Sequence, residues 1–200
     1  MWSLLALALG VVYAEFVGYW THVLLHSEHV PWLSKSHMLH HLRDYGPKKP
    51  LHRDGDYLSS ADGRSNILGL GLEWFLPLAV VIGTTILCLT LLGIPALYQA
   101  LFTSAGLLWG HFLFGAMHTS MHQNDFWMLR FPVLKTWYLR LRARHDFHHL
   151  QFSDEGRMLK NYGICFFWFD RILGTYAAKP QKFNHAGYEA ALKRYKNLLG

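Results

Sequence analysis

Three long apolar stretches alternate with polar segments along the chain. Residues 1–25 are almost entirely apolar, residues 67–92 form a second apolar run, and residues 95–118 form a third. A helix of about twenty apolar residues spans the hydrocarbon core of a bilayer. The pattern therefore predicts an all-α, integral-membrane helical bundle with three transmembrane helices. The polar segments, residues 26–66 and 119–200, are predicted to form a helical cap.

The positive charges are confined to two blocks of the chain. All nineteen Lys and Arg residues lie within residues 35–64 and 130–196, outside the three apolar stretches. Charged residues make up only 16% of the chain, whereas about a quarter is usual for soluble proteins. Lys and Arg near membrane spans favour the cytoplasmic side. We therefore expect a multi-pass protein of the bacterial inner membrane or the endoplasmic reticulum, with its cap on the cytoplasmic face.

The basic residues also bear on the choice between membrane and nucleic acid as partner. Between Phe126 and Arg144, Lys and Arg are interleaved with Trp and Tyr. Trp and Tyr favour the headgroup region of a bilayer, and Lys and Arg favour anionic lipid. This segment is therefore predicted to be an interfacial helix, and no nucleic acid partner is expected.

Histidine is the residue type that carries candidate chemistry. Ten of the fourteen histidines fall in four clusters, in the order spaced pair, His-x-x-His-His, spaced pair, His-x-x-His-His. Positions i, i+3 and i+4 share a helix face, so each cluster is expected to aim its imidazoles at one point. Neutral imidazole binds zinc, copper, iron and nickel, and ten ligands suit two ions. The predicted metal ligands are His22, His26, His37, His40, His41, His118, His122, His145, His148 and His149.

Other classes of metal protein fit less well. Zinc proteases carry His-Glu-x-x-His, and no cluster here has that glutamate. Zinc fingers are excluded because the chain has only two cysteines, Cys88 and Cys165. A histidine-rich metal transporter or sensor stays open as an alternative. It would need ionisable residues along a pore, whereas the clusters gather at one end of the predicted spans.

Two predicted spans carry an ionisable residue on the same helical stripe as their histidines. Glu15 lies seven residues before His22, and His111 lies seven residues before His118. An ionisable residue inside a membrane segment is a functional hypothesis by default. Both are candidates to orient a ligand or to approach the substrate, and a purely structural buried hydrogen bond is the alternative for each.

Carboxylates near the clusters are candidates for a supporting role. Asp44, Asp146 and Asp154 could accept hydrogen bonds from the N–H groups of metal-bound histidines. A solvated loop carboxylate or a helix cap is the alternative for each. His52 has no partner at ligand spacing and is predicted to be a surface residue.

The four clusters and the segment Asn161–Tyr176 together resemble the fatty acid hydroxylase/sterol desaturase superfamily. The likeness runs from about His22 to Tyr176 and includes the ending Phe-Trp-Phe-Asp-Arg-Ile-Leu-Gly-Thr-Tyr, which is similar to the family's segment after the last cluster. Members are integral-membrane, non-haem di-iron oxidoreductases. The resemblance implies one domain over residues 1–200, two iron ions on the ten histidines, and Asn161 as a further candidate near them. Zinc could replace iron in a preparation.

The resemblance also implies a reaction and its partners. O₂ as co-substrate would attack an unactivated C–H bond of a fatty acyl, sterol or carotenoid lipid, with desaturation as the alternative outcome. We expect no fused cytochrome domain in these 200 residues and therefore a separate electron donor, either a b-type cytochrome or a ferredoxin with its reductase. An acidic donor would be steered to basic residues of the cap. The expected docking residues are Arg140, Arg142 and Arg144.

Overall fold

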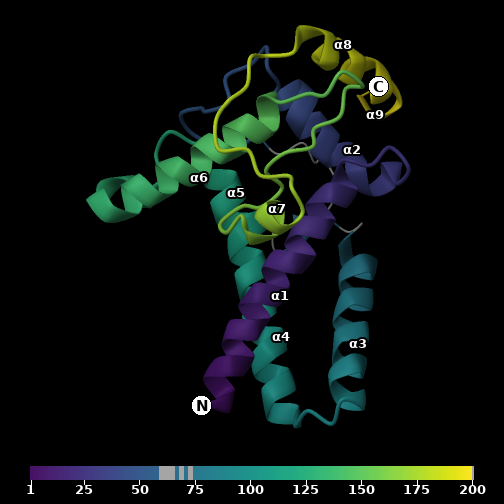
Figure 1. Cartoon of the computed structure of the whole chain (residues 1–200), viewed down its shortest axis with the longest axis vertical. Helices are drawn as coiled ribbons and strands as arrows, with labels where there is room; N and C mark the ends of the chain where they lie inside the picture. The colour runs from purple at the N-terminus through teal and green to yellow at the C-terminus, as the bar shows by residue number, and fades with distance from the viewer. Residues whose placement is uncertain (59–65, 68–69, 72–73, 200) are drawn as a thin grey trace.

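Three helices extend from one side of the molecule and the remaining elements gather at their other end (Figure 1). A computed structural model describes residues 1–58, 66–67, 70–71 and 74–199. The three helices are α1 (Trp2–Leu25), α3 (Phe75–Leu91) and α4 (Ala96–His111). The N-terminus lies at the far end of this layer, and the C-terminus lies in the cap (Figure 1).

The helices α1 and α4 pack closely against each other. Gly10 allows this approach, because a methyl group in its place would overlap the carbonyl oxygen of Phe102. The Tyr13 ring packs on the Phe102 ring with a centroid distance of 5.3 Å. The Tyr13 hydroxyl also lies 2.6 Å from the Thr85 hydroxyl, which links α1 to α3. These contacts fix where the C-terminal ends of α1 and α4 enter the cap.

Two helical runs are long and apolar enough to cross a membrane. They are Trp2–Leu25, with 24 residues, and Ala96–Ser120, with 25 residues, while α3 is apolar but has only 17. Large apolar side chains on these helices face outward, including Leu91, which is 77% exposed, and Leu108, which is 72% exposed. The core helix of a soluble protein would hide such side chains, whereas a lipid environment accepts them.

The second predicted span begins later than expected. The prediction started this span at residue 67, but α3 begins at Phe75. The strands β1 (Asn66–Ile67) and β2 (Leu70–Gly71) pair there in antiparallel orientation, with Ile67 opposite Leu70. Glycines alternate with leucines in the sequence from Leu68 to Leu72, and each glycine inside a helix costs about 1 kcal/mol relative to alanine. Hydropathy alone does not register this cost.

The cap is also helical, so the described chain is all-α apart from β1 and β2. Its first part contains α2 (Pro31–Leu39) followed by a π-helical segment, His40–Asp44. A second π-helical segment, Phe112–Met117, joins α4 to the short helix α5 (His118–Ser120). The later elements are a 3₁₀ turn (Trp127–Arg130), α6 (Pro132–Leu150), α7 (Trp168–Ile172), α8 (His185–Arg194) and α9 (Lys196–Leu199).

The helix α6 carries the later part of the predicted interfacial helix and continues through the fourth histidine cluster, whereas the predicted start forms the 3₁₀ turn Trp127–Arg130. It extends sideways from the junction between the long helices and the cap (Figure 1). Apolar side chains at its start are exposed, among them Phe131 and Val133, the latter 83% exposed. The other end of α6 is buried and holds three of the candidate ligands.

Candidate metal centre

Nine of the ten predicted ligands form two groups, and within each group the ligand nitrogens lie within 4.8 Å of one another. The groups draw on the end of α1 and the residue after it, α2, the first two residues of the first π-helical segment, the residues after α5, and α6. We name them by their size. The five-histidine group is His22, His26, His37, His41 and His148, and the four-histidine group is His40, His122, His145 and His149.

Each His-x-x-His-His triplet serves both groups. On α6, His145 and His149 belong to the four-histidine group while His148 belongs to the five-histidine group. In the triplet between residues 37 and 41 the assignment is reversed, since the middle histidine belongs to the four-histidine group. The expectation that each cluster points its rings at one point is therefore wrong for the triplets. Consecutive helical residues point about 100° apart, so the adjacent histidines of each triplet diverge to two centres.

The spacing of the ring nitrogens matches the ligand shell of a metal ion. In the five-histidine group the Nε2 atom of His26 lies 3.1 Å from those of His37 and His148. In the four-histidine group the Nε2 atom of His145 lies 3.0 Å from that of His122 and 3.2 Å from that of His149. Imidazole nitrogens about 2.0–2.1 Å from one ion and 90–109° apart are separated by about 2.9–3.4 Å.

Backbone carbonyls fix the tautomer of several rings. In the five-histidine group, Nδ1 of His22 donates to the Tyr162 carbonyl and Nδ1 of His148 donates to the Lys160 carbonyl, each at 2.6 Å. Both acceptors lie in residues 160–177, which we call the strap. A proton held on Nδ1 leaves the lone pair on Nε2, and metal-binding histidines are commonly oriented in this way.

The four-histidine group is oriented by a different segment. Nδ1 of His149 donates to the Tyr45 carbonyl at 3.1 Å, and Nδ1 of His122 donates to the Leu51 carbonyl at 2.8 Å. Nδ1 of His40 lies 3.1 Å from the Tyr57 hydroxyl. These acceptors all lie in residues 45–57, which we call the support loop.

Hydrogen bonds between the rings cannot satisfy these nitrogens. A neutral imidazole has one N–H and one lone pair. With their protons on Nδ1, His122 and His149 both direct Nε2 lone pairs at the Nε2 atom of His145, which has at most one proton to give. Within the described chain, the buried Nε2 atoms of His22 and His40 have no hydrogen-bond partner. A cation in each group would satisfy these lone pairs, so the donor set fits a metal.

The electrostatics of the cap keep the rings neutral. Burial lowers the pKa of His26, His41 and His149 well below its usual value, and neighbouring histidines lower it further. Burial lowers the pKa of His122 to about 4, although its bond to the Leu51 carbonyl acts in the opposite direction. Neutral imidazole is the form that binds a metal.

The tenth predicted ligand, His118, lies beside the four-histidine group without belonging to either group. Its ring centroid is 4.8 Å from that of His145 and 5.0 Å from that of His40. Its buried Nε2 atom has no hydrogen-bond partner among the described residues. His118 is therefore close enough to the centre to remain a candidate ligand.

Glu15 and His111, the two ionisable residues predicted to share a helical stripe with the histidines, lie in different environments. Glu15 is buried and accepts a hydrogen bond of 2.8 Å from the Trp109 indole of α4, and it forms no hydrogen bond to a histidine of the described chain. His111 is exposed, and its ring lies over Gly115. The expected stripe from His111 to His118 is wrong, because the π-helical segment Phe112–Met117 changes the helical phase between them.

The candidate carboxylates bind other partners. Asp146 accepts from His52 at 2.9 Å, and His52, predicted to be a surface residue, is partly exposed and belongs to neither histidine group. Asp44 pairs with the neighbouring Arg43 at 2.8 Å. Asp154 accepts from the Asn184 side chain at 2.8 Å. In each case the bond found joins the carboxylate to a group outside the two histidine groups.

Two of the three arginines expected to dock an electron donor are engaged within the cap. Arg142 donates to the Gln123 carbonyl at 3.0 Å. Arg144 donates to the Tyr176 hydroxyl at 3.1 Å and lies over the Tyr176 and Phe147 rings. Arg140 is exposed. These contacts give Arg142 and Arg144 structural roles that the sequence did not indicate.

Several residues of the site were not anticipated from the sequence. The Tyr45 ring packs on the His122 ring at a centroid distance of 4.1 Å, and the Tyr57 ring lies nearly parallel to the Tyr45 ring at 5.6 Å. The Tyr162 ring contacts the rings of His22 and His26 at 5.7 Å. Tyrosines in a polar loop carry no spacing signal, and carbonyl acceptors carry no residue-type signal at all.

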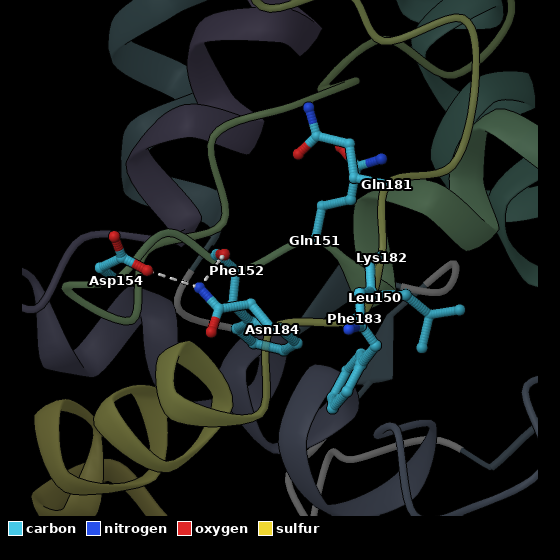
Figure 2. A pocket seen from close by; sticks show the side chains of 8 residues that line it. All are labelled: Leu150, Gln151, Phe152, Asp154, Gln181, Lys182, Phe183 and Asn184. Atoms are coloured by element: carbon cyan, nitrogen blue, oxygen red, sulfur yellow. Dashed lines mark hydrogen bonds between the residues drawn. The ribbon is translucent and has the colours of Figure 1, made fainter.

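A separate hollow lies on the cap, with a volume of about 350 Å³ (Figure 2). Its lining is largely polar, and Asn184 bridges two of its walls by donating to Asp154 and to the Phe152 carbonyl (Figure 2). None of its lining residues is a histidine, so it is distinct from the metal centre. The lining residues are Leu150, Gln151, Phe152, Asp154, Gln181, Lys182, Phe183 and Asn184.

Comparisons with known proteins agree with this geometry. The family model described as fatty acid hydroxylase matches residues 68–175, just over half of the chain. No curated protein and no solved structure gives a significant match. The matched range contains the third and fourth histidine clusters, and the fold brings the first two clusters, which precede it, to the same place.

Proposed function

The chain belongs to the fatty acid hydroxylase family, and from this premise we propose that it is a membrane-bound, non-haem di-iron oxygenase. It would use O₂ and external electrons to hydroxylate an unactivated C–H bond of a lipid. The observation that carries the proposal is the convergence of nine histidines into two groups of buried imidazoles. An alkyl C–H bond has no acidic proton and no leaving group, so acid–base side chains alone do not cleave it.

The metal would supply the chemistry, and the chain would supply ligands and orientation. Two iron ions, when bound, provide the redox capacity that O₂ activation requires. The five-histidine group and the four-histidine group would hold one ion each, with His118 as a further candidate ligand. The strap and the support loop keep protons on Nδ1 of four histidines and so present their Nε2 lone pairs. Burial excludes water from the rings.

We also propose a multi-pass topology with the histidines on the cytoplasmic face. The long helices α1, α3 and α4 contain no Lys or Arg. Every Lys and Arg of the described chain lies in the cap, beginning with Lys35 in α2. This asymmetry supports a cytoplasmic cap by the positive-inside rule. The outward apolar faces of the long helices support contact with acyl chains. The helix α3 is the shortest of the proposed spans.

The proposed substrate is a fatty acyl, sterol or carotenoid lipid, and the proposed electron donor is a separate b-type cytochrome or ferredoxin with its reductase. The apolar surroundings of α1 and α4 support a substrate that reaches the centre from the bilayer. Desaturation is the alternative reaction, since hydroxylation and desaturation both begin with removal of hydrogen from an unactivated carbon. A metal transporter is disfavoured because the candidate ligands gather at one end of the helices.

The experiment compares the lipids of cells that produce the protein, cells that produce His145→Ala, and cells that produce neither. Under ¹⁸O₂, hydroxylation predicts a lipid that gains one labelled oxygen only with the unaltered protein. A product that has lost two hydrogens would replace hydroxylation by desaturation. Identical lipids in all three cultures, with the protein loaded with iron and supplied with a reductant, would contradict an oxygenase.

A further inference from the structure

The strap residue Asn161 lies between two residues whose carbonyls orient histidines of the same group. The residue before it, Lys160, accepts from His148, and the residue after it, Tyr162, accepts from His22. Both histidines belong to the five-histidine group. One tripeptide therefore sets the tautomer of two rings that arrive from α6 and α1.

Asn161 has the backbone conformation that this arrangement requires. Its φ of 57° makes it the one non-glycine residue with positive φ in the described chain. Asn is among the few residue types that tolerate the left-handed region, because its short polar side chain can form local hydrogen bonds. A β-branched or bulky residue would strain the chain at this position.

The Asn161 side chain is fully buried and saturated with hydrogen bonds. Its Nδ2 donates to the carbonyls of Arg144 and Ala177, each at 3.1 Å. Its Oδ1 accepts from the Ala177 amide at 2.8 Å, and its own amide donates to the Thr175 carbonyl at 3.0 Å. Asn161 is thus joined both to α6, which carries His148, and to the far end of the strap.

A buried carboxylate fixes the second half of the tripeptide. Asp170 accepts from the amides of Tyr162 and Gly163, at 2.8 and 2.7 Å, and from the Thr175 hydroxyl at 2.8 Å. The Thr175 hydroxyl lies 3.1 Å from the Tyr19 hydroxyl of α1. Asn161 and Asp170 therefore tie the strap to the two helices whose histidines it orients.

We propose that Asn161 is a positioning residue that builds the five-histidine group and not the four-histidine group. The asymmetry follows from the bonds: the acceptors beside Asn161 serve His22 and His148, whereas His122 and His149 are held by the support loop. The inference rests on the metal-binding part of the proposed function and is independent of the reaction and substrate.

The test measures metal per chain in the purified full-length protein after anaerobic dialysis against limiting Fe²⁺. We expect Asn161→Ala to lose one ion of two, with its affinity reduced about 10- to 100-fold, as for other partners that orient ligands. Asn161→Gly tolerates positive φ, so it should recover part of that affinity without the side-chain bonds. The matched control is Asn184→Ala, which removes side-chain hydrogen bonds at the start of α8, away from both histidine groups, and should retain both ions.

Ligand variants identify which ion is lost. In a His149→Ala background, which retains the five-histidine ion, Asn161→Ala should remove the remaining iron. In a His148→Ala background it should change the remaining affinity by less than about twofold, because the two changes then act on the same group. Retention of both ions by Asn161→Ala, or loss of both together, would overturn the inference. If the unaltered protein bound no iron, the proposed function would fall as well.

Discussion

The two histidine groups use the same ligand chemistry but rest on different supports. The strap beside the five-histidine group contains Asn161 and Asp170, which are both fully buried. The side-chain nitrogen and oxygen of Asn161 and both carboxylate oxygens of Asp170 form hydrogen bonds. The support loop beside the four-histidine group has a buried start at Tyr45 but exposed residues from Arg53 to Asp56. One group is thus held from within the cap, and the other from its surface.

This difference in support predicts that the two groups retain a metal unequally. The exposed part of the support loop pairs with the residues after α5: the Arg53 amide donates to the His122 carbonyl at 2.9 Å, and the Asn124 amide donates to the Arg53 carbonyl at 3.0 Å. Segments with exposed hydrogen bonds and few buried contacts open at lower free energy than buried ones. We therefore expect the four-histidine group to exchange its metal faster than the five-histidine group.

The largest expected effect comes from the adjacent ligands His148 and His149. Alanine at either position should reduce the metal content from two ions to one and lower oxygenase activity more than about 100-fold, since partners of ligands alone are worth about 10- to 100-fold. The two variants should retain different ions, and the ion left in His148→Ala should exchange faster. Equal exchange rates in the two variants, measured with an isotope of the same metal, would remove the distinction between the groups.

A change at the α1–α4 crossing should weaken both groups together, because α1 carries His22 and leads to His26, and the α4 run leads to His122. Gly10→Ala places a methyl group against the Phe102 carbonyl and should cost about 1–3 kcal/mol of stability. For a chain of this size each kcal/mol lowers Tm by about 2–4 °C.

The control for this prediction is Gly83→Ala on α3, where a methyl group meets no atom within 4 Å. That variant should leave Tm unchanged or raise it slightly, because alanine is the better helix former. Loss of only one ion in Gly10→Ala would show that the crossing supports one group alone.

The smallest expected effect is at Tyr57, whose hydroxyl lies 3.1 Å from Nδ1 of His40. Tyr57→Phe keeps the ring and removes this bond, so the affinity of the four-histidine group should fall about 10-fold while the other group is unchanged. Metal titration of the variant tests this expectation. Tyr13→Phe, which removes a hydroxyl bond to Thr85 far from the histidines along the chain, should bind both ions as before.

The sequence indicated the helices and most of the candidate ligands that converge, because both depend on local periodicity. Apolar runs of sufficient length predict the helices Trp2–Leu25 and Ala96–Ser120, and histidine spacing selected all nine members of the two groups. The same local logic was wrong for His111, because it assumed an unbroken α-helix through the π-helical segment Phe112–Met117. It was also wrong for the start of α3, because hydropathy does not include the helix cost of glycine.

By itself, the sequence therefore determined which side chains can bind a metal and which segments form apolar helices. Only the tertiary structure decided how the triplets divide between two groups, because that depends on where α1, α2 and α6 meet. It also decided which carbonyls hold the rings. Every residue has a carbonyl, so residue type cannot reveal that Lys160 and Tyr162 act for one group while Tyr45 and Leu51 act for the other.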